Sequence, residues 1–283
     1  MMNITKMHGL GNDFIIIDNR NGMLKDANKT AKKLCERRLS VGADGLIAVE
    51  NSSIADTRMR IYNSDGSEAE MCGNGIRCFA AYVYDKGIVT KEDFCVETLA
   101  GIMRPHMIIE DGRVKRVKVD MGSPSFAAED IPVLCENPLI NKIDVLGRKI
   151  SVYSCLMGVP HTVVIVDNRE VHDQDFEILS PVIEKHEVFK KNTNVNFAEI
   201  IDRKTVKVRT WERGAGPTLA CGTGACAVAV ASILNGLTED RVTVKLLGGD
   251  LLIEWDKEAD KVYMTGPAKV VFDGEIDLTD IDV

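Results

Sequence analysis

Ser67-Glu68-Ala69-Glu70-Met71-Cys72-Gly73-Asn74-Gly75-Ile76-Arg77-Cys78 carries a Cys-Gly-x-Gly motif where a turn gives way to a helix. Apolar residues follow at helical spacing, and Gly87 is a typical helix end. We therefore expect the Cys72 thiol and the N–H groups of Gly73 and Asn74 at a helix N-terminus. Unpaired N–H donors and the helix dipole favour an anion there and lower the pKa of a thiol.

The same motif occurs a second time, in Ala220-Cys221-Gly222-Thr223-Gly224-Ala225-Cys226, and opens a helix that ends near Gly236. A spacing of 149 residues separates Cys72 from Cys221, and the same spacing separates the two helix ends. One such motif is a weak signal. Two at a fixed spacing predict an internal duplication.

The spacing of 149 also aligns other segments of the chain. It matches Gly9 with Gly158, 14–17 with 163–166, 18–20 with 167–169, Arg60 with Arg209, and Tyr62 with Trp211. Near residue 94 the alignment slips by one residue. The sequence therefore predicts two copies of one fold.

We predict an α+β fold of two pseudo-symmetric lobes, each a mostly antiparallel sheet or barrel around a central helix, with the active site in the cleft between them. In the first copy, strands are expected at 14–18, 58–62, 94–97 and 114–119. A second helix is expected at 27–39, with its counterpart at 176–186. The N-terminal lobe is expected to span 1–120 and to be completed by 267–283, and the C-terminal lobe to span 121–266.

Composition narrows the class of protein. Of 283 residues, 45% are hydrophobic and 28% charged, which is typical of a globular protein. A net charge of −8 argues against a partner made of nucleic acid or anionic membrane. There is no secretory signal and no membrane-length apolar run, so a cytoplasmic protein is expected. The eight cysteines include no Cys-x-x-Cys pair and predict free thiols, with no metal site.

Two related lobes with equivalent helix N-termini predict a specific chemistry. A substrate carboxylate would bind the helix N–H donors, and the attached carbon would lie between two thiols. Such a pair can remove a proton from one face of the carbon and deliver another to the opposite face, which inverts a stereocentre. No motif indicates a pyridoxal-binding lysine, and we expect no cofactor.

Four motifs resemble those of the diaminopimelate epimerase family, and the resemblance covers nearly the whole chain. They are His8-Gly9-Leu10-Gly11-Asn12-Asp13-Phe14, Asn63-Ser64-Asp65-Gly66-Ser67-Glu68, Met71-Cys72-Gly73-Asn74-Gly75, and Glu212-Arg213-Gly214-Ala215-Gly216 through Cys221-Gly222-Thr223-Gly224. The resemblance implies a cofactor-independent epimerase that interconverts LL- and meso-diaminopimelate in lysine and peptidoglycan precursor synthesis. It also implies a homodimer.

The resemblance implies a role for each matching residue. Cys72 and Cys221 would be the acid/base pair. The N–H groups of Gly73, Asn74, Gly222 and Thr223 would hold the reacting carboxylate, and Glu212 and Asn12 the reacting ammonium.

Three further residues, Asn63, Asn194 and Arg213, would bind the distal carboxylate and ammonium of the substrate. A guanidinium is the natural partner of such a carboxylate. His161 is similar to a family histidine near the site, although a buried structural histidine is the commoner interpretation.

One position departs from the family pattern. Val159 stands where family members carry an asparagine that helps hold the distal group. An epimerase or racemase of the same build that acts on lanthionine or a basic amino acid is therefore an alternative. A thiol-redox or zinc-binding protein, and a binding protein without turnover, are alternatives from other classes.

Overall fold

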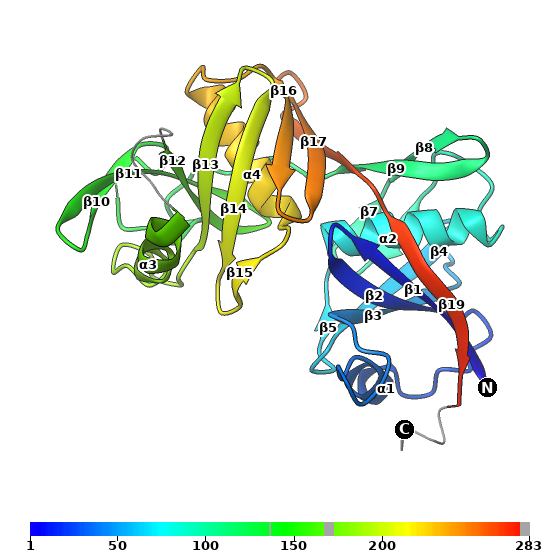
Figure 1. The fold of residues 1–283 in the computed structure, drawn as a ribbon. Helices are drawn as coiled ribbons and strands as arrows, with labels where there is room; N and C mark the ends of the chain where they lie inside the picture. The colour runs from blue at the N-terminus through cyan, green and yellow to red at the C-terminus, as the bar shows by residue number, and fades with distance from the viewer. Residues whose placement is uncertain (136, 167–172, 278–283) are drawn as a thin grey trace. The chain divides into compact units, whose positions relative to one another are not determined.

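The computed structural model describes residues 1–135, 137–166 and 173–277. The chain divides into two compact units. Figure 1 shows the helices and strands, coloured from the N-terminus to the C-terminus. Unit 1 comprises Met1–Asp120 and Thr265–Val283, and unit 2 comprises Met121–Met264. The second partner of the 18–20 match, residues 167–169, lies outside the described residues.

Unit 1 is built on one mixed sheet in the order β19-β1-β2-β3-β4-β6-β7, with β5 paired to β4; its β8–β9 hairpin is not part of this sheet. The pairs β2–β3 and β4–β6 are parallel, and the others along this order are antiparallel. The strands are β1 (Met2–Gly9), β2 (Asn12–Asp18), β3 (Gly45–Glu50), β4 (Thr57–Asn63), β5 (Glu68–Ala69), β6 (Val96–Thr98), β7 (Gly101–Met103), β8 (His106–Glu110), β9 (Arg113–Asp120) and β19 (Lys269–Ile276).

Helix α2 (Gly73–Asp85) is the central element of unit 1. Most of its residues are buried, and it packs against β1, β2, β3, β4 and β9. Strands therefore surround the helix that the Cys72 motif opens.

Helix α1 (Ala27–Leu34) is shorter than the predicted 27–39. It begins after Asp26, whose carboxylate accepts the N–H of Lys29, and it ends at Cys35. The backbone then turns through positive φ at Arg38 (75°) and Gly42 (73°), and a helix cannot continue through such residues. The predicted end was wrong because no glycine or proline marks the turn before residue 42.

Unit 2 repeats this plan in the sheet order β10-β11-β12-β13-β14-β16-β17, with β15 paired to β14. The pairs β12–β13 and β14–β16 are parallel, like their counterparts in unit 1. The strands are β10 (Asn141–Val145), β11 (Arg148–Met157), β12 (Val159–Val166), β13 (Asn194–Asp202), β14 (Thr205–Glu212), β15 (Gly216–Thr218), β16 (Arg241–Leu246), β17 (Gly249–Asp256) and β18 (Lys261–Gly266), the last of which contains the boundary between the units.

Helix α4 (Gly222–Leu234) is the central helix of unit 2 and packs against β11, β12, β13, β14, β16 and β17. Helix α3 (Asp173–Glu184) corresponds to the predicted 176–186, with both ends two or three residues earlier. Phe176, Leu179 and Ile183 on α3 are buried in an apolar cluster with residues of β12 and β13. The predicted α+β class, with two similar lobes around central helices, is confirmed.

Strand pairing confirms the spacing of 149 for the middle of each copy. Ile47 pairs with Ile61 between β3 and β4, and Asn196 pairs with Thr210 between β13 and β14. Both partners of the second pair lie 149 residues after those of the first. The duplication is therefore visible in the register of the strands.

The same spacing fails for the strand before it. Phe14 pairs with Gly45 between β2 and β3, a separation of 31 residues, whereas His161 pairs with Asn194 between β12 and β13, a separation of 33. Two extra residues between the strands of the second copy reduce the spacing of β2 and β12 to 147. The expected match of 14–17 with 163–166 is therefore corrected to 161–164, and Gly9 is equivalent to Met157 rather than Gly158. A spacing of 149 would match Asn12 with His161, but the strand register makes Val159 the equivalent of Asn12.

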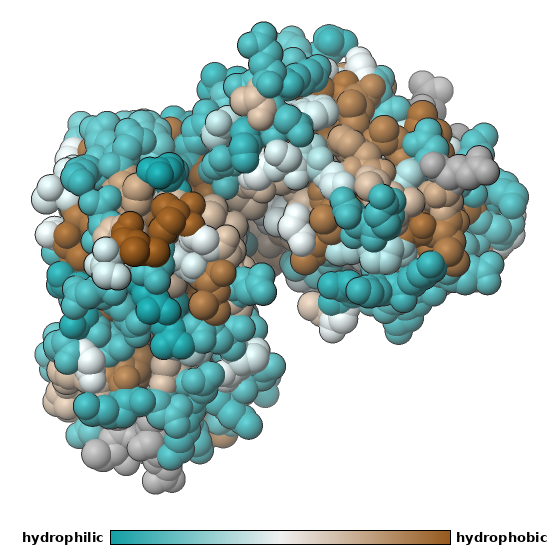
Figure 2. Space-filling model, turned by 180° about the vertical axis from the view of Figure 1, so that it is seen from behind, coloured by the Kyte–Doolittle hydropathy of each residue, from teal (hydrophilic) through white to brown (hydrophobic). Residues whose placement is uncertain are grey.

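The surface is mixed in character. Figure 2 shows small hydrophobic patches among hydrophilic residues on one face of the molecule. Along β19 three apolar side chains are exposed, namely Val270, Val271 and Phe272. No helix among the described residues is long and apolar enough to cross a membrane.

Candidate active site

Cys72 is the N-cap residue of α2. Its backbone is extended (φ −143°, ψ 122°), and its Sγ accepts the N–H of Gly75 at 3.4 Å. The N–H groups of Gly73 and Asn74 occupy the first two positions of the helix, where N–H donors have no partner within the helix. The thiol therefore lies among the donors of a helix N-terminus, as the sequence predicts.

Cys221 is the N-cap residue of α4 and has the same geometry. Its backbone is extended (φ −121°, ψ 113°), and its Sγ accepts the N–H of Gly224 at 3.4 Å. Gly222 and Thr223 occupy the first two positions of this helix. Each unit thus holds one half-site made of a thiol and a helix N-terminus.

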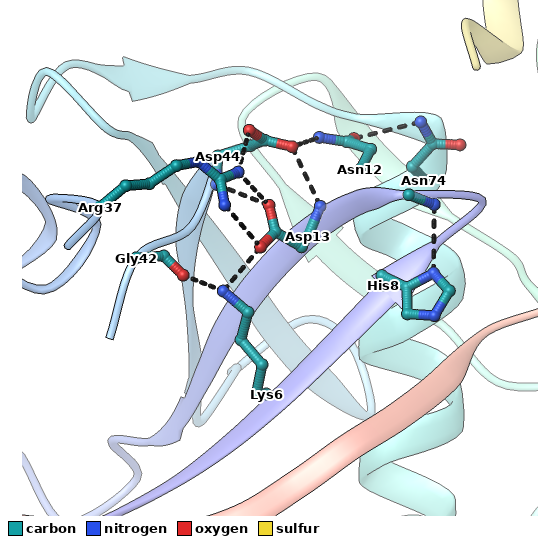
Figure 3. Close-up of polar contacts among 9 residues, drawn as sticks. Lys6, His8, Asn12, Asp13, Arg37, Gly42, Asp44 and Asn74 are labelled. Carbon is teal, nitrogen blue, oxygen red and sulfur yellow. Dashed lines mark hydrogen bonds and ion pairs between the residues drawn. The ribbon is translucent and has the colours of Figure 1, made fainter. Parts of the chain in front are cut away.

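In unit 1 a chain of hydrogen-bonded amide side chains lies beside the thiol, and Figure 3 shows its members Asn74 and Asn12 with Asp44. The Cys72 Sγ lies 3.7 Å from the Asn12 Oδ1, which also accepts the Nδ2 of Asn74 at 3.1 Å. The Asn12 Nδ2 donates to the Asp44 carboxylate at 2.8 Å. At the other end the buried Arg77 guanidinium donates to the Asn74 Oδ1 at 2.9 Å.

A cluster of ion pairs supports Asp44 (Figure 3). Arg37 contacts both Asp44 and Asp13, at 2.8 Å and 2.6 Å, and Lys6 contacts Asp13 at 2.7 Å. Burial raises the pKa of Asp13, but hydrogen bonds from Arg37 and Lys6 outweigh burial and lower it to about 2. The carboxylate end of the amide chain is therefore held by fixed charges.

In unit 2 a histidine is connected to the thiol through the hydroxyl of Thr223. His161 is fully buried, and its Nε2 lies 2.9 Å from the Thr223 Oγ1, which lies 3.5 Å from the Cys221 Sγ. The His161 Nδ1 lies 3.2 Å from the Asn196 Nδ2. Burial, together with the charge of Arg213, lowers the pKa of His161 to about 3, so the imidazole is neutral at physiological pH.

The Glu212-Arg213 turn is fixed from two sides. The Arg213 N–H donates to the Asn194 Oδ1 at 2.8 Å, and the Asn194 Nδ2 donates to the Pro160 carbonyl at 3.0 Å. From α3 the buried Glu184 accepts the Trp211 Nε1 at 2.8 Å and the Gly214 N–H at 3.1 Å. Glu212 ends β14, and the Arg213 side chain is exposed and donates to the Lys191 carbonyl at 2.9 Å.

Two predicted residues lie at the ends of strands. Asn63 ends β4, is exposed, and donates from its Nδ2 to the Ser67 Oγ at 2.9 Å. Val159 begins β12 and is 37% exposed. Within unit 1 the structure brings Cys72, Asn12 and Asn74 together, and within unit 2 it brings Cys221, Thr223 and His161 together.

Sequence reasoning missed four residues that hold these half-sites. Asp44 and Arg77 fix the amide chain of unit 1, Asn196 contacts His161, and Glu184 fixes the Glu212-Arg213 turn. Asn196 could have been found, because a polar residue in the otherwise apolar run 195–198 needs a buried partner. Asp44 carries no such local signal.

The described residues contain no group of three His, Cys, Asp or Glu side chains that could hold a metal ion. All eight cysteines are free thiols. Within the described part of the chain, the zinc-binding alternative therefore lacks a set of ligands.

Solved structures with the same fold include racemases and epimerases. A probable proline racemase from Agrobacterium radiobacter superposes with a TM-score of 0.70 at 15% identity, covering 98% of this chain and 93% of that one. A protein of the PhzF phenazine biosynthesis family from Bacillus anthracis gives a TM-score of 0.69 at 16% identity, covering 98% and 99%. These likenesses define the fold class as the duplicated α+β fold of this group.

Sequence comparison identifies the family. The family model described as diaminopimelate epimerase matches residues 4–127 and 153–271. Proteins named diaminopimelate epimerase are 49% identical in Acetivibrio thermocellus, over 99% of this chain and 100% of the relative, and 52% identical in Desulfitobacterium hafniense, over 96% and 97%. The chain belongs to the diaminopimelate epimerase family.

Proposed function

We propose that this protein is a diaminopimelate epimerase that interconverts LL- and meso-diaminopimelate with two cysteines and no cofactor. The observation that supports this proposal most directly is the pair of half-sites. In each unit the N-cap residue of the central helix is a cysteine, Cys72 in unit 1 and Cys221 in unit 2. Family membership at about half identity supports the substrate.

The two half-sites supply what the reaction needs. The α-proton of an amino acid is very weakly acidic, so the charge that develops on its removal must be stabilised. In the proposed mechanism the substrate carboxylate binds N–H groups of Gly73, Asn74, Gly222 and Thr223 at the helix N-termini, where donors and dipole favour negative charge. One cysteine thiolate removes the α-proton, and the thiol of the other protonates the opposite face.

The remaining residues would select the substrate. Arg213 is exposed on a turn fixed by Asn194 and suits a second carboxylate, with Asn63 as a further contact. Glu212, with the amide of Asn12, would bind the reacting ammonium. A second carboxylate distinguishes diaminopimelate from a basic amino acid, because a basic amino acid has none to offer Arg213.

Val159 is the position that bears on specificity. Its apolar side chain offers no hydrogen bond where we expect the distal group of the substrate, and by strand register it is equivalent to Asn12. We propose that Arg213 and Asn194 suffice for diaminopimelate. A Val159→Asn variant compared with the unchanged protein on diaminopimelate and on lanthionine tests this specificity.

The reaction can be tested in D₂O. Early in turnover of LL- or meso-diaminopimelate, the product should gain one α-deuterium while the remaining substrate stays largely unlabelled, because each face has its own base. Return of the original proton to the product would indicate one base serving both faces. Lanthionine and lysine are the comparison substrates, and faster turnover of either would overturn the substrate assignment.

Single cysteine variants separate the two roles. Cys72→Ala and Cys221→Ala should each abolish epimerisation, and each can retain exchange of the α-proton of one stereoisomer only. Cys78→Ala is the matched control, because this thiol is fully buried in the helix that Cys72 caps. Full epimerisation by either active-site variant would contradict the mechanism.

We also propose that the protein works in the cytoplasm as a homodimer. The free thiols suit a reducing compartment. Among the described residues, β19 is the last strand in its sheet order and exposes Val270, Val271 and Phe272, a surface suited to a second copy.

A further inference from the structure

The two half-sites present opposite hydrogen-bonding groups to their thiols. Cys72 faces an amide oxygen, whereas Cys221 faces a hydroxyl whose proton can be placed by following the bonds around it. The orientation of each group is fixed within its own unit by partners that can act only as donors or only as acceptors.

In unit 1 the fixed groups are an arginine and a carboxylate. The Arg77 guanidinium can only donate, so it requires the oxygen of the Asn74 amide and turns the Asn74 Nδ2 toward Asn12. The ion-paired Asp44 carboxylate can only accept, so it requires the Asn12 Nδ2. Both contacts leave the Asn12 Oδ1 facing the Cys72 Sγ, which can then only donate its S–H in that contact.

In unit 2 the fixed group is a backbone carbonyl. The Asn196 Nδ2 lies 3.4 Å from the Thr162 carbonyl, which can only accept, and its Oδ1 accepts the Thr210 hydroxyl at 3.0 Å. This orientation points an N–H of Asn196 at the His161 Nδ1, so that nitrogen is an acceptor. The proton of the neutral imidazole is therefore on Nε2.

A series of hydrogen bonds connects His161 to the Cys221 thiol through Thr223. The His161 Nε2–H donates to the Thr223 Oγ1, and the hydroxyl proton of Thr223 is then available to the Cys221 Sγ. Each sulfur accepts one backbone N–H at 3.4 Å, from Gly75 in unit 1 and from Gly224 in unit 2. The additional hydroxyl donor is therefore what favours the thiolate at Cys221.

We propose that the resting protein holds its proton on Cys72 and its negative charge on Cys221, and that His161 and Asn196 are positioning residues that set this arrangement through Thr223. The consequence for turnover rests on the proposed function. The Cys221 thiolate takes the α-proton, the C–H electron pair stays on the carbon, and the Cys72 thiol gives its proton to the opposite face. Turnover then ends with a Cys72 thiolate and a Cys221 thiol, and proton exchange with water restores the resting form.

One charge in unit 1 acts against this assignment. Arg77 is buried on the same helix as Cys72 and favours an anion there, although it donates to the carbonyls of Gly73 and Pro267 as well as to Asn74. Asp44, behind Asn12, acts in the opposite direction. In unit 2 the charge of Arg213 disfavours a proton on His161. Because the hydrogen-bonded groups touch the sulfurs, we infer that they outweigh these charges.

The test is the titration of the two thiols in the full chain without substrate. The protein is pulsed with iodoacetamide across a range of pH, and the Cys72 and Cys221 peptides are quantified by mass spectrometry. Midpoints are compared rather than rates, because Cys221 is 7% exposed and Cys72 is half-buried. Burial raises the pKa of Cys35, Cys78 and Cys155 to about 12, so these thiols do not titrate in the same range.

We expect the Cys221 midpoint to lie at least about one pH unit below that of Cys72, a tenfold difference in thiolate fraction. Thr223→Val should raise the Cys221 midpoint toward that of Cys72, and Thr223→Ser, which keeps the hydroxyl, should preserve it. The ultraviolet absorbance of the thiolate, compared between Cys72→Ser and Cys221→Ser, gives the same titration without a need for reagent access.

Two results would overturn the proposal. One is a Cys72 midpoint equal to or below that of Cys221, which would mean that Arg77 decides the charge. The other is a Cys221 midpoint that does not move in Thr223→Val protein with an unchanged circular dichroism spectrum. Neither measurement uses a substrate, so the proposal can fail while the epimerase activity stands, and the activity can fail while the proposal stands.

Discussion

A methyl group added at Gly224 tests how tightly the unit 2 half-site is packed. A Cβ at this position would lie 2.5 Å from the Asn196 Oδ1 and 3.3 Å from the Cys221 Sγ. The Asn196 amide cannot yield easily, because it bonds His161, Thr162 and Thr210. Gly224→Ala should therefore displace the amide and break at least one of its buried hydrogen bonds.

The magnitude follows from three opposing effects. Alanine in place of glycine in a helix stabilises it by about 1 kcal/mol. Overpacking costs about 1–3 kcal/mol, and a buried polar group left unpaired costs about 1–3 kcal/mol more. The net loss in the free energy of unfolding is about 1–5 kcal/mol, and the middle of this range corresponds to a fall in Tm of roughly 10 °C.

Gly75→Ala is the matched control, because Gly75 occupies the same helix position in unit 1. Its Cβ would meet the Cδ1 atoms of Ile61 at 3.1 Å and Ile47 at 3.4 Å, and the ends of flexible side chains can shift. We expect a change within about 1 kcal/mol, because the helix preference of alanine offsets the crowding.

Thermal unfolding followed by two signals measures both variants. Tryptophan fluorescence reports on unit 2, since the two tryptophans lie in β14 and β17, and circular dichroism reports on both units. The Gly224→Ala protein should lose its fluorescence transition about 10 °C earlier, and Gly75→Ala should leave it in place. Equal stability of the two variants would refute the packing argument.

Two further predictions follow from the pKa of His161 and from β19. The pKa of His161 falls from about 6.5 in the unfolded chain to about 3 in the folded protein, so the unfolded state binds the proton first and stability is lost as the pH falls below about 6.5. Urea unfolding should show a loss of about 2 kcal/mol between pH 7 and pH 5 from this group, and His161→Gln should flatten that slope; an identical slope in the variant would contradict the assignment. Phe272→Glu should convert the proposed dimer to a monomer in light scattering, with Ile54→Glu, exposed elsewhere in unit 1, as the control, and a monomeric unchanged protein would remove the dimer proposal.

Much of each half-site could be predicted because it is local in sequence. An N-cap side chain bonds the N–H three residues later, so Cys72 and Gly75 need only the Cys-Gly-x-Gly motif to form their contact. The helix that follows is specified by its apolar spacing. The repetition of the motif after 149 residues then indicates that the second half of the chain forms the same structure.

The bonds that orient the half-sites could not be predicted in this way. Asn12 and Asp44 are 32 residues apart, and His161 and Asn196 are 35 apart. They meet because parallel strands bring them together, and the register of those strands differs by two residues between the copies. A spacing of 149 counted along the chain would match Asn12 with His161, whereas the strand register makes Val159 its equivalent in unit 2.

The sequence by itself determined that this protein has two thiols at the starts of two equivalent helices, because capping and helical spacing act within a few residues. Only the tertiary structure decided what each thiol faces. The sequence does not specify whether the oxygen or the nitrogen of an asparagine side chain faces a given neighbour. That orientation depends on partners such as Arg77 and the Thr162 carbonyl, which the fold brings next to the amide. The two copies are therefore alike in their backbone and opposite in the groups that they present to sulfur.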